Sequence, residues 1–176
     1  MLDQRLATRV ENFVSRLKRE SVCMHGFILD VRGEVKATAY YSPFEEGKAH
    51  RMYSVSKSMT ALAIGLLLDE GKISLDDRIA DYFRDFLPEK PDARLMRLKI
   101  RDMLRMATCY RATVYRETDD DWTKPFFTAE PTHEPGTVFH YDTGCSQVLA
   151  ALVARLTGRQ VIDYLTERVF TPLGAN

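Results

Sequence analysis

The sequence predicts an α+β fold in which a cluster of helices packs on an antiparallel sheet. Two β-rich runs within residues 26–41 flank the pair Arg32-Gly33, which is typical of a hairpin. Longer segments elsewhere place apolar residues at helical spacing. Since 176 residues suffice for one hydrophobic core, we expect residues 1–176 to form a single α+β domain, here incomplete for the reason given below.

Before the hairpin, a stripe of apolar residues predicts an amphipathic helix with charges on its other face. The residues of this stripe are Leu2, Leu6, Val10, Phe13 and Leu17. Residues 42–51, which follow the hairpin, are polar and predict a loop. A helix from about Val55 to Glu70 comes next, and Gly71 is a natural stop for it.

Further helices are expected along the rest of the chain. Ser74 is the expected N-cap of a short helix, with Asp76 and Asp77 near its positive end. Another short helix is expected at about 100–106, and residues 107–137, which show no period, are expected to form a long surface loop.

Two helices close the chain. The first is expected to end at Gly158, and the second, which begins near Val161, is closed by Pro172 and Gly174. Nothing after this stop returns to the hairpin, and a lone two-stranded ribbon is marginal in water and leaves its edges unpaired. We therefore expect that the strands completing the sheet are absent from this chain.

Charge and cysteine content limit the classes of function. Twenty-five Lys and Arg residues balance 25 Asp and Glu residues, so we expect no nucleic-acid partner and no membrane partner. The three cysteines, Cys23, Cys109 and Cys145, form no C-x-x-C pair, so neither a zinc site nor a disulfide framework is expected. Reduced thiols and an N-terminus without the apolar core of a signal peptide favour a cytoplasmic protein.

Ser54 and Lys57 lie almost one helical turn apart at the start of the apolar helix. A cation is disfavoured there by the helix macrodipole and by burial, so Lys57 is expected to give up its proton and act as a general base. A general base beside a hydroxyl makes the alcohol a nucleophile, and the helix terminus offers N–H groups to a developing oxyanion.

A purely structural interpretation is also open, because Ser54 or Ser56 can cap the helix while Lys57 extends to solvent. The S-x-x-K pattern alone is weak, since about one chance match is expected in a chain of this length. A second match, from Ser15 to Lys18, lies on the charged N-terminal helix, where the lysine faces water, and is discarded.

An ordered series of segments makes the pattern more specific. The segments are YSVSKSMTALAIGLLLDEGKISLDDRIADYF, LKIRDMLRMAT, EPGTVFHYDTGCSQVLAALVARLTG and DYLTERVFTPLG. From about Gly26 to Gly174, the chain resembles the serine β-lactamase and penicillin-binding-protein superfamily. The nearest branch is that of class C β-lactamases, esterases and 6-aminohexanoate-dimer-hydrolase-like enzymes.

This resemblance implies a β-lactamase/transpeptidase-like fold, no cofactor, and three catalytic residues. Ser54 is the implied acyl-accepting nucleophile, Lys57 its proton partner, and Tyr141 the tyrosine of the family's Tyr-x-Asn motif. Thr143 stands where asparagine is usual and is an expected substrate-binding residue, together with His140 and Trp122 at the edge of the cleft.

The family's third motif, K-[ST]-G or H-x-G on a late strand, does not occur in the sequence. That strand also supplies the second oxyanion donor, and loss of one such donor costs about 10²–10³ in rate. We therefore expect this chain to be the N-terminal part of a longer hydrolase or a natural truncation.

Other patterns indicate no further chemistry. The four histidines show no ligand spacing, so no metal is expected. The triplet Asp142-Thr143-Gly144 recurs in aspartic proteases, but a helix follows it here, and Asp142 or Thr143 as a helix cap is the better explanation. The acidic run 119–122 is expected to be a solvated loop, and Cys145 a small buried side chain.

The leading hypothesis is a serine hydrolase that cleaves a small-molecule ester, amide or lactam through an acyl-enzyme on Ser54. The alternative, from a different class, is a truncated, non-catalytic remnant that acts as a binding or self-assembly module. Such a remnant would form homo-oligomers by pairing the free edge of its hairpin with another copy.

Overall fold

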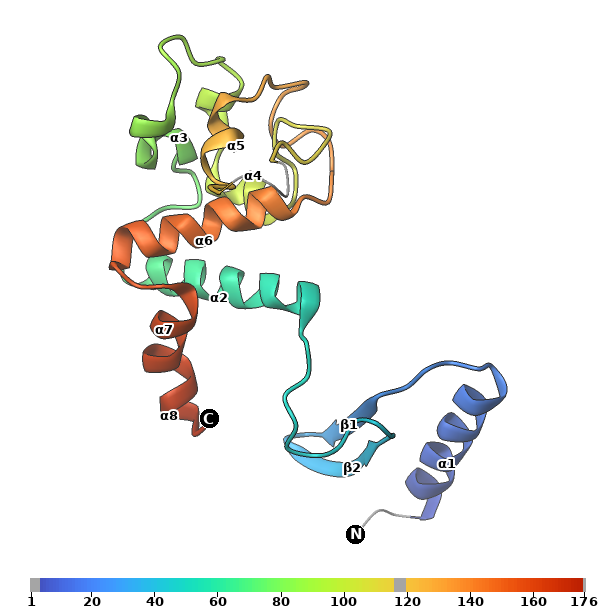
Figure 1. Ribbon diagram of the computed structural model, residues 1–176. Helices are drawn as coiled ribbons and strands as arrows, with labels where there is room; N and C mark the ends of the chain where they lie inside the picture. The colour runs from blue at the N-terminus through green and yellow to red at the C-terminus, as the bar shows by residue number, and fades with distance from the viewer. Residues whose placement is uncertain (1–3, 116–119, 176) are drawn as a thin grey trace. The chain divides into compact units, whose positions relative to one another are not determined.

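The computed structural model describes residues 4–115 and 120–175 (Figure 1). By the pattern of contacts along the chain, the protein separates into two compact units, residues 1–51 and residues 52–176. That residues 1–176 form a single domain stays a prediction.

The first unit contains helix α1 (Gln4–Arg19) and strands β1 (Gly26–Val31) and β2 (Glu34–Tyr40). The helix confirms the amphipathic pattern, although Leu2 lies outside the described residues. The rings of Phe13 and Phe27 meet edge-to-face with centroids 5.7 Å apart, so an apolar residue of α1 contacts one of the hairpin.

The predicted hairpin is confirmed, with Gly26 opposite Tyr40 and Val31 opposite Glu34 in an antiparallel ladder. Arg32 and Gly33 both have a positive φ (57° and 80°), the geometry of a two-residue turn whose twist matches that of the strands. Among the described residues, β1 and β2 form the only sheet. Both outer edges of this ribbon therefore lack a strand partner within the described chain.

In the second unit, the structure forms a series of helices joined by short 3₁₀ turns. These are α2 (Ser56–Asp69), α3 (Ile79–Tyr82), α4 (Ile100–Leu104), α5 (Lys124–Thr128), α6 (Thr143–Thr157), α7 (Val161–Leu165) and α8 (Thr171–Leu173), with 3₁₀ turns at Tyr53–Val55, Arg84–Phe86 and Leu95–Arg97 and a π-helical turn at Thr166–Phe170.

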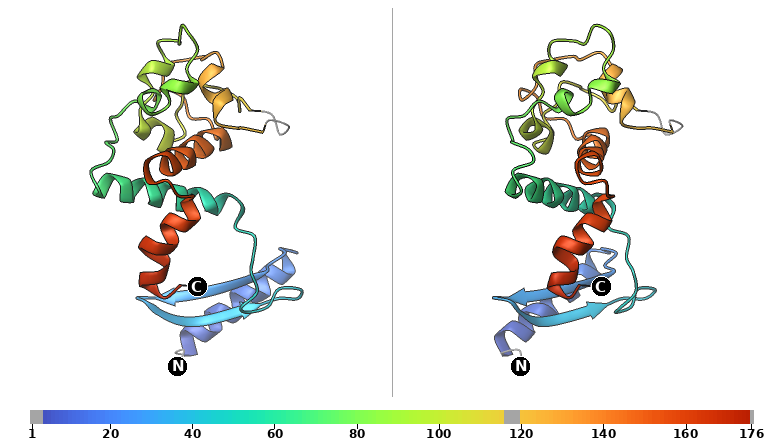
Figure 2. Two further views of the ribbon diagram at one scale, coloured as in Figure 1. Left: turned by 60° about the vertical axis from the view of Figure 1, so that its left-hand side comes forward. Right: turned by 90° about the vertical axis from the view of Figure 1, so that its left-hand side faces the viewer.

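Helix α6 lies along α2 on one side and below the short helices α3 to α5 on the other, as Figures 1 and 2 show. The two long helices end as the sequence predicts. Gly71 adopts a positive φ of 67°, and the N–H of Lys72 donates to the carbonyl of Leu67, which closes α2. Gly158, with φ at 70°, closes α6.

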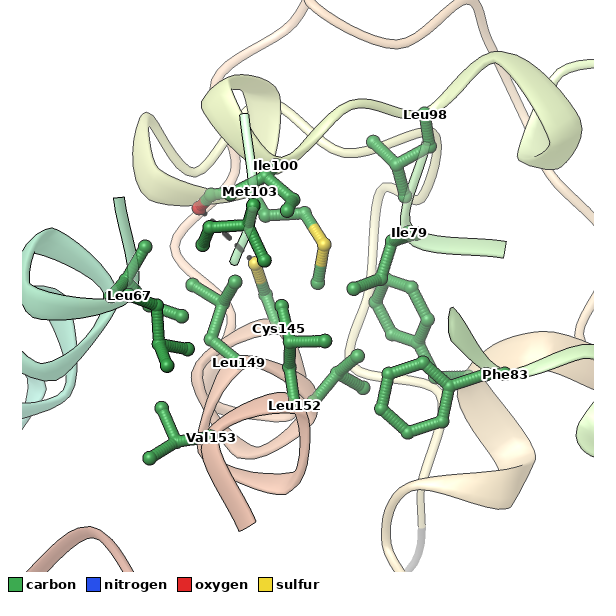
Figure 3. Close-up of a cluster of buried hydrophobic side chains, with 14 of the residues drawn as sticks. Leu67, Ile79, Phe83, Leu98, Ile100, Met103, Cys145, Leu149, Leu152 and Val153 are labelled. Atoms are coloured by element: carbon green, nitrogen blue, oxygen red, sulfur yellow. Dashed lines mark hydrogen bonds between the residues drawn. The ribbon is translucent and has the colours of Figure 1, made fainter. Parts of the chain in front are cut away.

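The core of this unit forms between α6 and its neighbours (Figure 3). Leu152, Leu67 and Phe83 are fully or almost fully buried there, although they come from α6, from α2 and from the residue that follows α3. Burial of one such side chain stabilises the fold by about 1.5–3 kcal/mol. Cys145 is also buried, as expected; its thiol donates to the carbonyl of Met103 at 3.2 Å, and burial raises its pKa.

The expectation that Ser74 caps a helix was wrong. The N–H of Ser74 donates to Oδ2 of Asp77 at 2.7 Å, which also accepts from the hydroxyl of Tyr82 at 2.5 Å. These bonds hold residues 74–77 in a turn, and α3 begins only at Ile79. The Asp77 carboxylate thus accepts hydrogen bonds within the turn and does not lie at a helix N-terminus.

The expected long surface loop at 107–137 was also wrong for its described residues. The N–H groups of Thr132, Gly136 and His140 donate to carbonyls of Cys109, Ala107 and Met106, all at 2.8 Å. Helix α5 lies in this stretch, and its side chains Phe126 and Phe127 are fully buried beside Tyr110. Long-range backbone pairing and buried aromatics, rather than a local period, give the segment its structure.

The last helical stretch confirms the stop at Gly174, although Pro172 lies inside α8 and does not end it. Within the described residues, no helix is both long enough and apolar enough to cross a bilayer.

Candidate active site

Ser54 and Lys57 lie at the N-terminal end of α2. Ser54 is the middle residue of the 3₁₀ turn Tyr53–Val55, and Lys57 is the second residue of α2. Their side chains point toward each other: Nζ of Lys57 donates to Oγ of Ser54 at 3.2 Å. The spacing of three residues therefore brings the two groups together as the sequence predicts.

The surroundings separate Ser54 from the neighbouring serine. The hydroxyl of Ser56 donates to the carbonyl of Tyr53 at 2.6 Å, so it is bound to the backbone of the preceding turn. Ser54 is exposed, and Lys57 is only half-buried. Among the described residues, no salt bridge includes Lys57, so its amine is directed to the Ser54 hydroxyl and not to a carboxylate.

The residue before the nucleophile candidate has a strained backbone. Tyr53 has φ at 46°, in the left-handed region that an aromatic residue seldom adopts, and its side chain is 74% exposed. Such strain persists only where the neighbouring structure imposes it, and it is concentrated at functional sites. In this case it sets the sharp turn that presents Ser54 ahead of α2.

Tyr141 approaches the same pair from the segment that leads into α6. Nζ of Lys57 lies 5.1 Å from the centroid of the Tyr141 ring. Hydrogen bonding with Ser54 first, and with Lys57 second, lowers the pKa of Tyr141 below its ordinary value of 10.0. The structure thus brings together three of the predicted site residues: a hydroxyl, an amine and a phenol.

This arrangement can transfer protons in a defined order. A neutral Lys57 amine can accept the Ser54 proton, and the Tyr141 phenol can donate one to a departing group. The N–H groups of Val55 and Ser56 already donate to the carbonyls of Met52 and Tyr53. A developing negative charge would therefore be met by N–H groups ahead of them, such as that of Ser54.

The other predicted site residues do not join this group by any contact of the described chain. Trp122 stacks on Tyr115 with ring centroids 4.2 Å apart. Thr143 is the first residue of α6, and His140 is held through its backbone N–H by the carbonyl of Met106. Their substrate-binding roles stay predictions. Of the acidic run 119–122, Asp119 lies outside the described residues.

Sequence reasoning missed the long-range partner of Asp142, the residue after Tyr141. Asp142 caps α6, as expected, but it also accepts from the hydroxyl of Thr113 at 2.9 Å, 29 residues away. Neither Thr113 nor Tyr115, which stacks on Trp122, lies in a periodic pattern of apolar residues. Only a signal that links distant positions of the chain could have identified them.

A large hollow lies elsewhere on this unit. It has a volume of about 890 Å³ between α2, α6 and α7, with Met59, Ala151 and Leu165 among its lining residues. Ser54, Lys57 and Tyr141 do not line it. We assign the candidate site from the mutual geometry of its side chains, because chemistry requires that geometry and a hollow alone does not supply it.

Within the described stretches, no group of three or more His, Cys, Asp or Glu side chains is arranged to hold a metal ion.

Comparison with known proteins identifies the family of the chain. The family model described as Beta-lactamase matches residues 25–176, which is most of the chain and includes all three residues of the candidate site. The chain belongs to the beta-lactamase family. The match also includes the hairpin, so the family resemblance extends over both compact units.

One curated relative is the 6-aminohexanoate-dimer hydrolase of Paenarthrobacter ureafaciens. It is 27% identical over 188 residues, which cover 97% of this chain and 47% of the relative. The chain thus spans about half the length of this relative.

Solved structures show the fold. A putative β-lactamase from Bacteroides dorei matches with a TM-score of 0.77 at 17% identity, covering 95% of this chain and 51% of the other. D-amino acid amidase from Ochrobactrum anthropi SV3 matches with a TM-score of 0.68 at 20% identity, covering 89% and 51%. The protein has a partial β-lactamase/transpeptidase fold, as its resemblance implies.

Proposed function

We propose that this chain carries the nucleophile and proton-transfer groups of a serine hydrolase that forms an acyl-enzyme on Ser54. The 3.2 Å contact between Lys57 Nζ and Ser54 Oγ supports this proposal most strongly. A lysine used only to solubilise the helix end would extend to water, whereas this one is directed at a hydroxyl.

The proposed reaction has two half-reactions. Neutral Lys57 takes the proton of Ser54 while the serine oxygen attacks the substrate carbonyl. The proton then passes through Tyr141 to the leaving alcohol or amine as the carbonyl–heteroatom bond breaks. Water adds to the acyl-enzyme, loses its proton to the same groups, and releases the acid product with Ser54 restored.

The proposed substrates are small-molecule esters or amides. The names of two similar proteins, 6-aminohexanoate-dimer hydrolase and D-amino acid amidase, favour an amide. The reaction as written uses only side-chain groups of this chain and needs no cofactor.

Active-site labelling tests the proposal. The protein is incubated with a fluorophosphonate at neutral pH, and its intact mass is followed with time. A single adduct is expected, because the activated serine displaces fluoride from phosphorus. Ser54→Ala should abolish this adduct.

Ser56→Ala is the matched control, since Ser56 lies two residues away with its hydroxyl bound to the backbone. Ser56→Ala should be labelled like the parent protein. Absence of any Ser54-dependent adduct in the folded parent would contradict the hydrolase proposal.

A second candidate function is self-assembly through the hairpin. Both edges of the β1–β2 ribbon lack a strand partner in the described chain, and Ile28 and Val35 on it are 62% and 57% exposed. Exposed strand edges with apolar side chains favour pairing with another copy.

Sedimentation measurements separate the two candidates. Self-assembly through the hairpin predicts an oligomer that Val35→Pro converts to a monomer, because proline removes an N–H from the strand. A parent protein that is monomeric at all accessible concentrations contradicts self-assembly and leaves the hydrolase proposal intact.

A further inference from the structure

Asp142, the residue after Tyr141, is a buried carboxylate with an unusual set of partners. Its side chain is almost completely buried, with 1% of the residue exposed. Its Oδ1 accepts two hydrogen bonds at 2.9 Å, one from the N–H of Gly144 and one from the hydroxyl of Thr113. Its Oδ2 is buried without a hydrogen-bond partner among the described residues.

These bonds join two distant segments at the start of α6. The bond to Gly144 caps the helix, and the bond to Thr113 fastens an otherwise irregular segment to the same carboxylate oxygen. Asp142 therefore fixes the first turn of α6 against a segment about 30 positions earlier in the chain.

An aromatic stack holds the same place from outside. A Cβ atom added to Gly144 would lie 3.0 Å from Cδ1 of Tyr115, so the Tyr115 ring lies directly on the helix backbone. Trp122 stacks on Tyr115 at a centroid distance of 4.2 Å and an interplanar angle of 13°. The first turn of α6 thus contacts both the Asp142 carboxylate and the Tyr115 ring, and that ring in turn stacks on Trp122.

The backbone just before Tyr141 is fixed as well. The N–H of His140 donates to the carbonyl of Met106 at 2.8 Å. Tyr141 lies between this anchor and the Asp142 anchor, yet its own side chain is 51% exposed. Two rigid neighbours therefore restrict a side chain that few packing contacts could restrict by themselves.

Helix stability alone does not account for this carboxylate. Serine or asparagine caps a helix about as well as aspartate, without the cost of burying a charge that has one oxygen unpaired. The macrodipole of α6 offsets part of that cost. The second bond, to Thr113, is the feature that a simple cap does not need.

We propose that Asp142, bound to Thr113, is a positioning residue that holds the Tyr141 ring beside Lys57 and Ser54. The catalytic consequence of this inference rests on the proposed hydrolase function. The positioning itself does not, because it can be measured on a protein that turns over no substrate.

The direct test is a nuclear magnetic resonance titration of protein labelled with carbon-13 at the phenolic carbon of tyrosine. The signal of Tyr141, one of eight tyrosines, is assigned by its loss in Tyr141→Phe. In the parent protein this signal should titrate below the ordinary tyrosine range, since Ser54 and Lys57 stabilise the phenolate.

Asp142→Ala should return the Tyr141 titration to the ordinary range, because the ring would leave its two partners. Asp142→Asn, which keeps an oxygen acceptor for both bonds, should restore the parent behaviour. Thr113→Val removes only the long-range bond and should produce a shift in the same direction as Asp142→Ala.

Thr157→Val is the matched control, since its hydroxyl bonds to the carbonyl of Val153 at the opposite end of α6. It should leave the Tyr141 titration unchanged. If Asp142→Ala does not fold, the Tyr141 titration of Thr113→Val tests the inference, because this variant retains the hydrogen bond from the N–H of Gly144 to Asp142. A Tyr141 titration equal to the parent's in folded Thr113→Val or Asp142→Ala would overturn the inference.

The kinetic readout separates this inference from the proposed function. If the parent is labelled at Ser54, ester hydrolysis by Asp142→Ala should lose about 10–10²-fold in kcat with little change in KM, as expected for a misplaced catalytic group. A parent protein that is not labelled contradicts the hydrolase proposal, while the titration still tests the positioning.

Discussion

The two compact units of this protein differ in how their side chains are buried. None of the described residues before Met52 is buried, although the first unit has a well-formed hairpin and an amphipathic helix. The second unit contains the entire buried core of the described chain. Hydrogen bonding between neighbouring segments thus forms secondary structure in both units, but only the second adds extensive burial of apolar surface.

This difference bears on the candidate site. Ser54, Lys57 and Tyr141 all belong to the second unit, where α2 and α6 are held by a shared core. Catalytic geometry must be kept within a fraction of an ångström, and packed helices provide that rigidity better than an exposed ribbon. We therefore expect the site geometry to persist under conditions that unfold the hairpin.

Amide hydrogen exchange on the whole chain should show the largest contrast. Amides in the middle of α6, such as that of Leu152, open only with loss of the core, whereas those of β1, such as Phe27, open locally. We expect the α6 amides to exchange on the order of 10³-fold more slowly. Equal protection in β1 and α6 would mean that the two units unfold together.

A matched pair of truncations should give the next largest effect. Leu152→Ala removes a fully buried side chain and should lower the free energy of unfolding by about 2–5 kcal/mol. Val35→Ala removes a side chain that is 57% exposed and should change it by less than about 0.5 kcal/mol. Urea unfolding followed by circular dichroism measures both. Similar decreases in the free energy of unfolding for the two variants would contradict the difference in burial between the two units.

An effect smaller than that of Leu152→Ala is expected at the carboxylate of Glu70, which joins the end of α2 to α7. Hydrogen bonds from Lys72 and Tyr164, followed by the charge of Arg168, lower the pKa of Glu70 below 4.5. Because the folded pKa lies below the unfolded one, this contribution is present above about pH 4.5 and is lost as pH falls through the folded value.

Glu70→Gln should therefore reduce stability at neutral pH by less than about 1 kcal/mol, since solvent screens these bonds, and should remove that part of the acid dependence. Glu34→Gln, which breaks an ion pair with Lys36 on the hairpin, is the control in the first unit. It should leave the stability of the core unchanged. An unaltered acid profile for Glu70→Gln would show that this group adds nothing to the fold.

The sequence predicted those features that depend on neighbouring residues. The Arg32-Gly33 turn, the stops at Gly71 and Gly158, and the one-turn spacing of Ser54 and Lys57 follow from local backbone geometry. The turn at Ser74 was missed because the Asp77 carboxylate bonds back to Ser74 instead of to a helix end.

Long-range contacts could not be predicted in the same way. The ordered segment after α4 depends on backbone bonds between residues more than twenty positions apart, such as that from Thr132 to Cys109. The bond from Thr113 to Asp142 is of the same kind. Such pairs produce no periodic pattern of apolar residues in the sequence, because the two partners become neighbours only when the chain folds.

The central claim is that Lys57 activates Ser54, and a comparison of two lysine variants tests it most directly. The rate of fluorophosphonate labelling at neutral pH is measured for the parent, for Lys57→Ala, and for Lys18→Ala, whose lysine belongs to the S-x-x-K pattern on α1. If Lys57 is the general base, Lys57→Ala should lower the labelling rate by about 10²–10⁴-fold and leave the circular dichroism spectrum unchanged. Lys18→Ala should leave the labelling rate unchanged. Labelling of folded Lys57→Ala at the parent rate would contradict the claim.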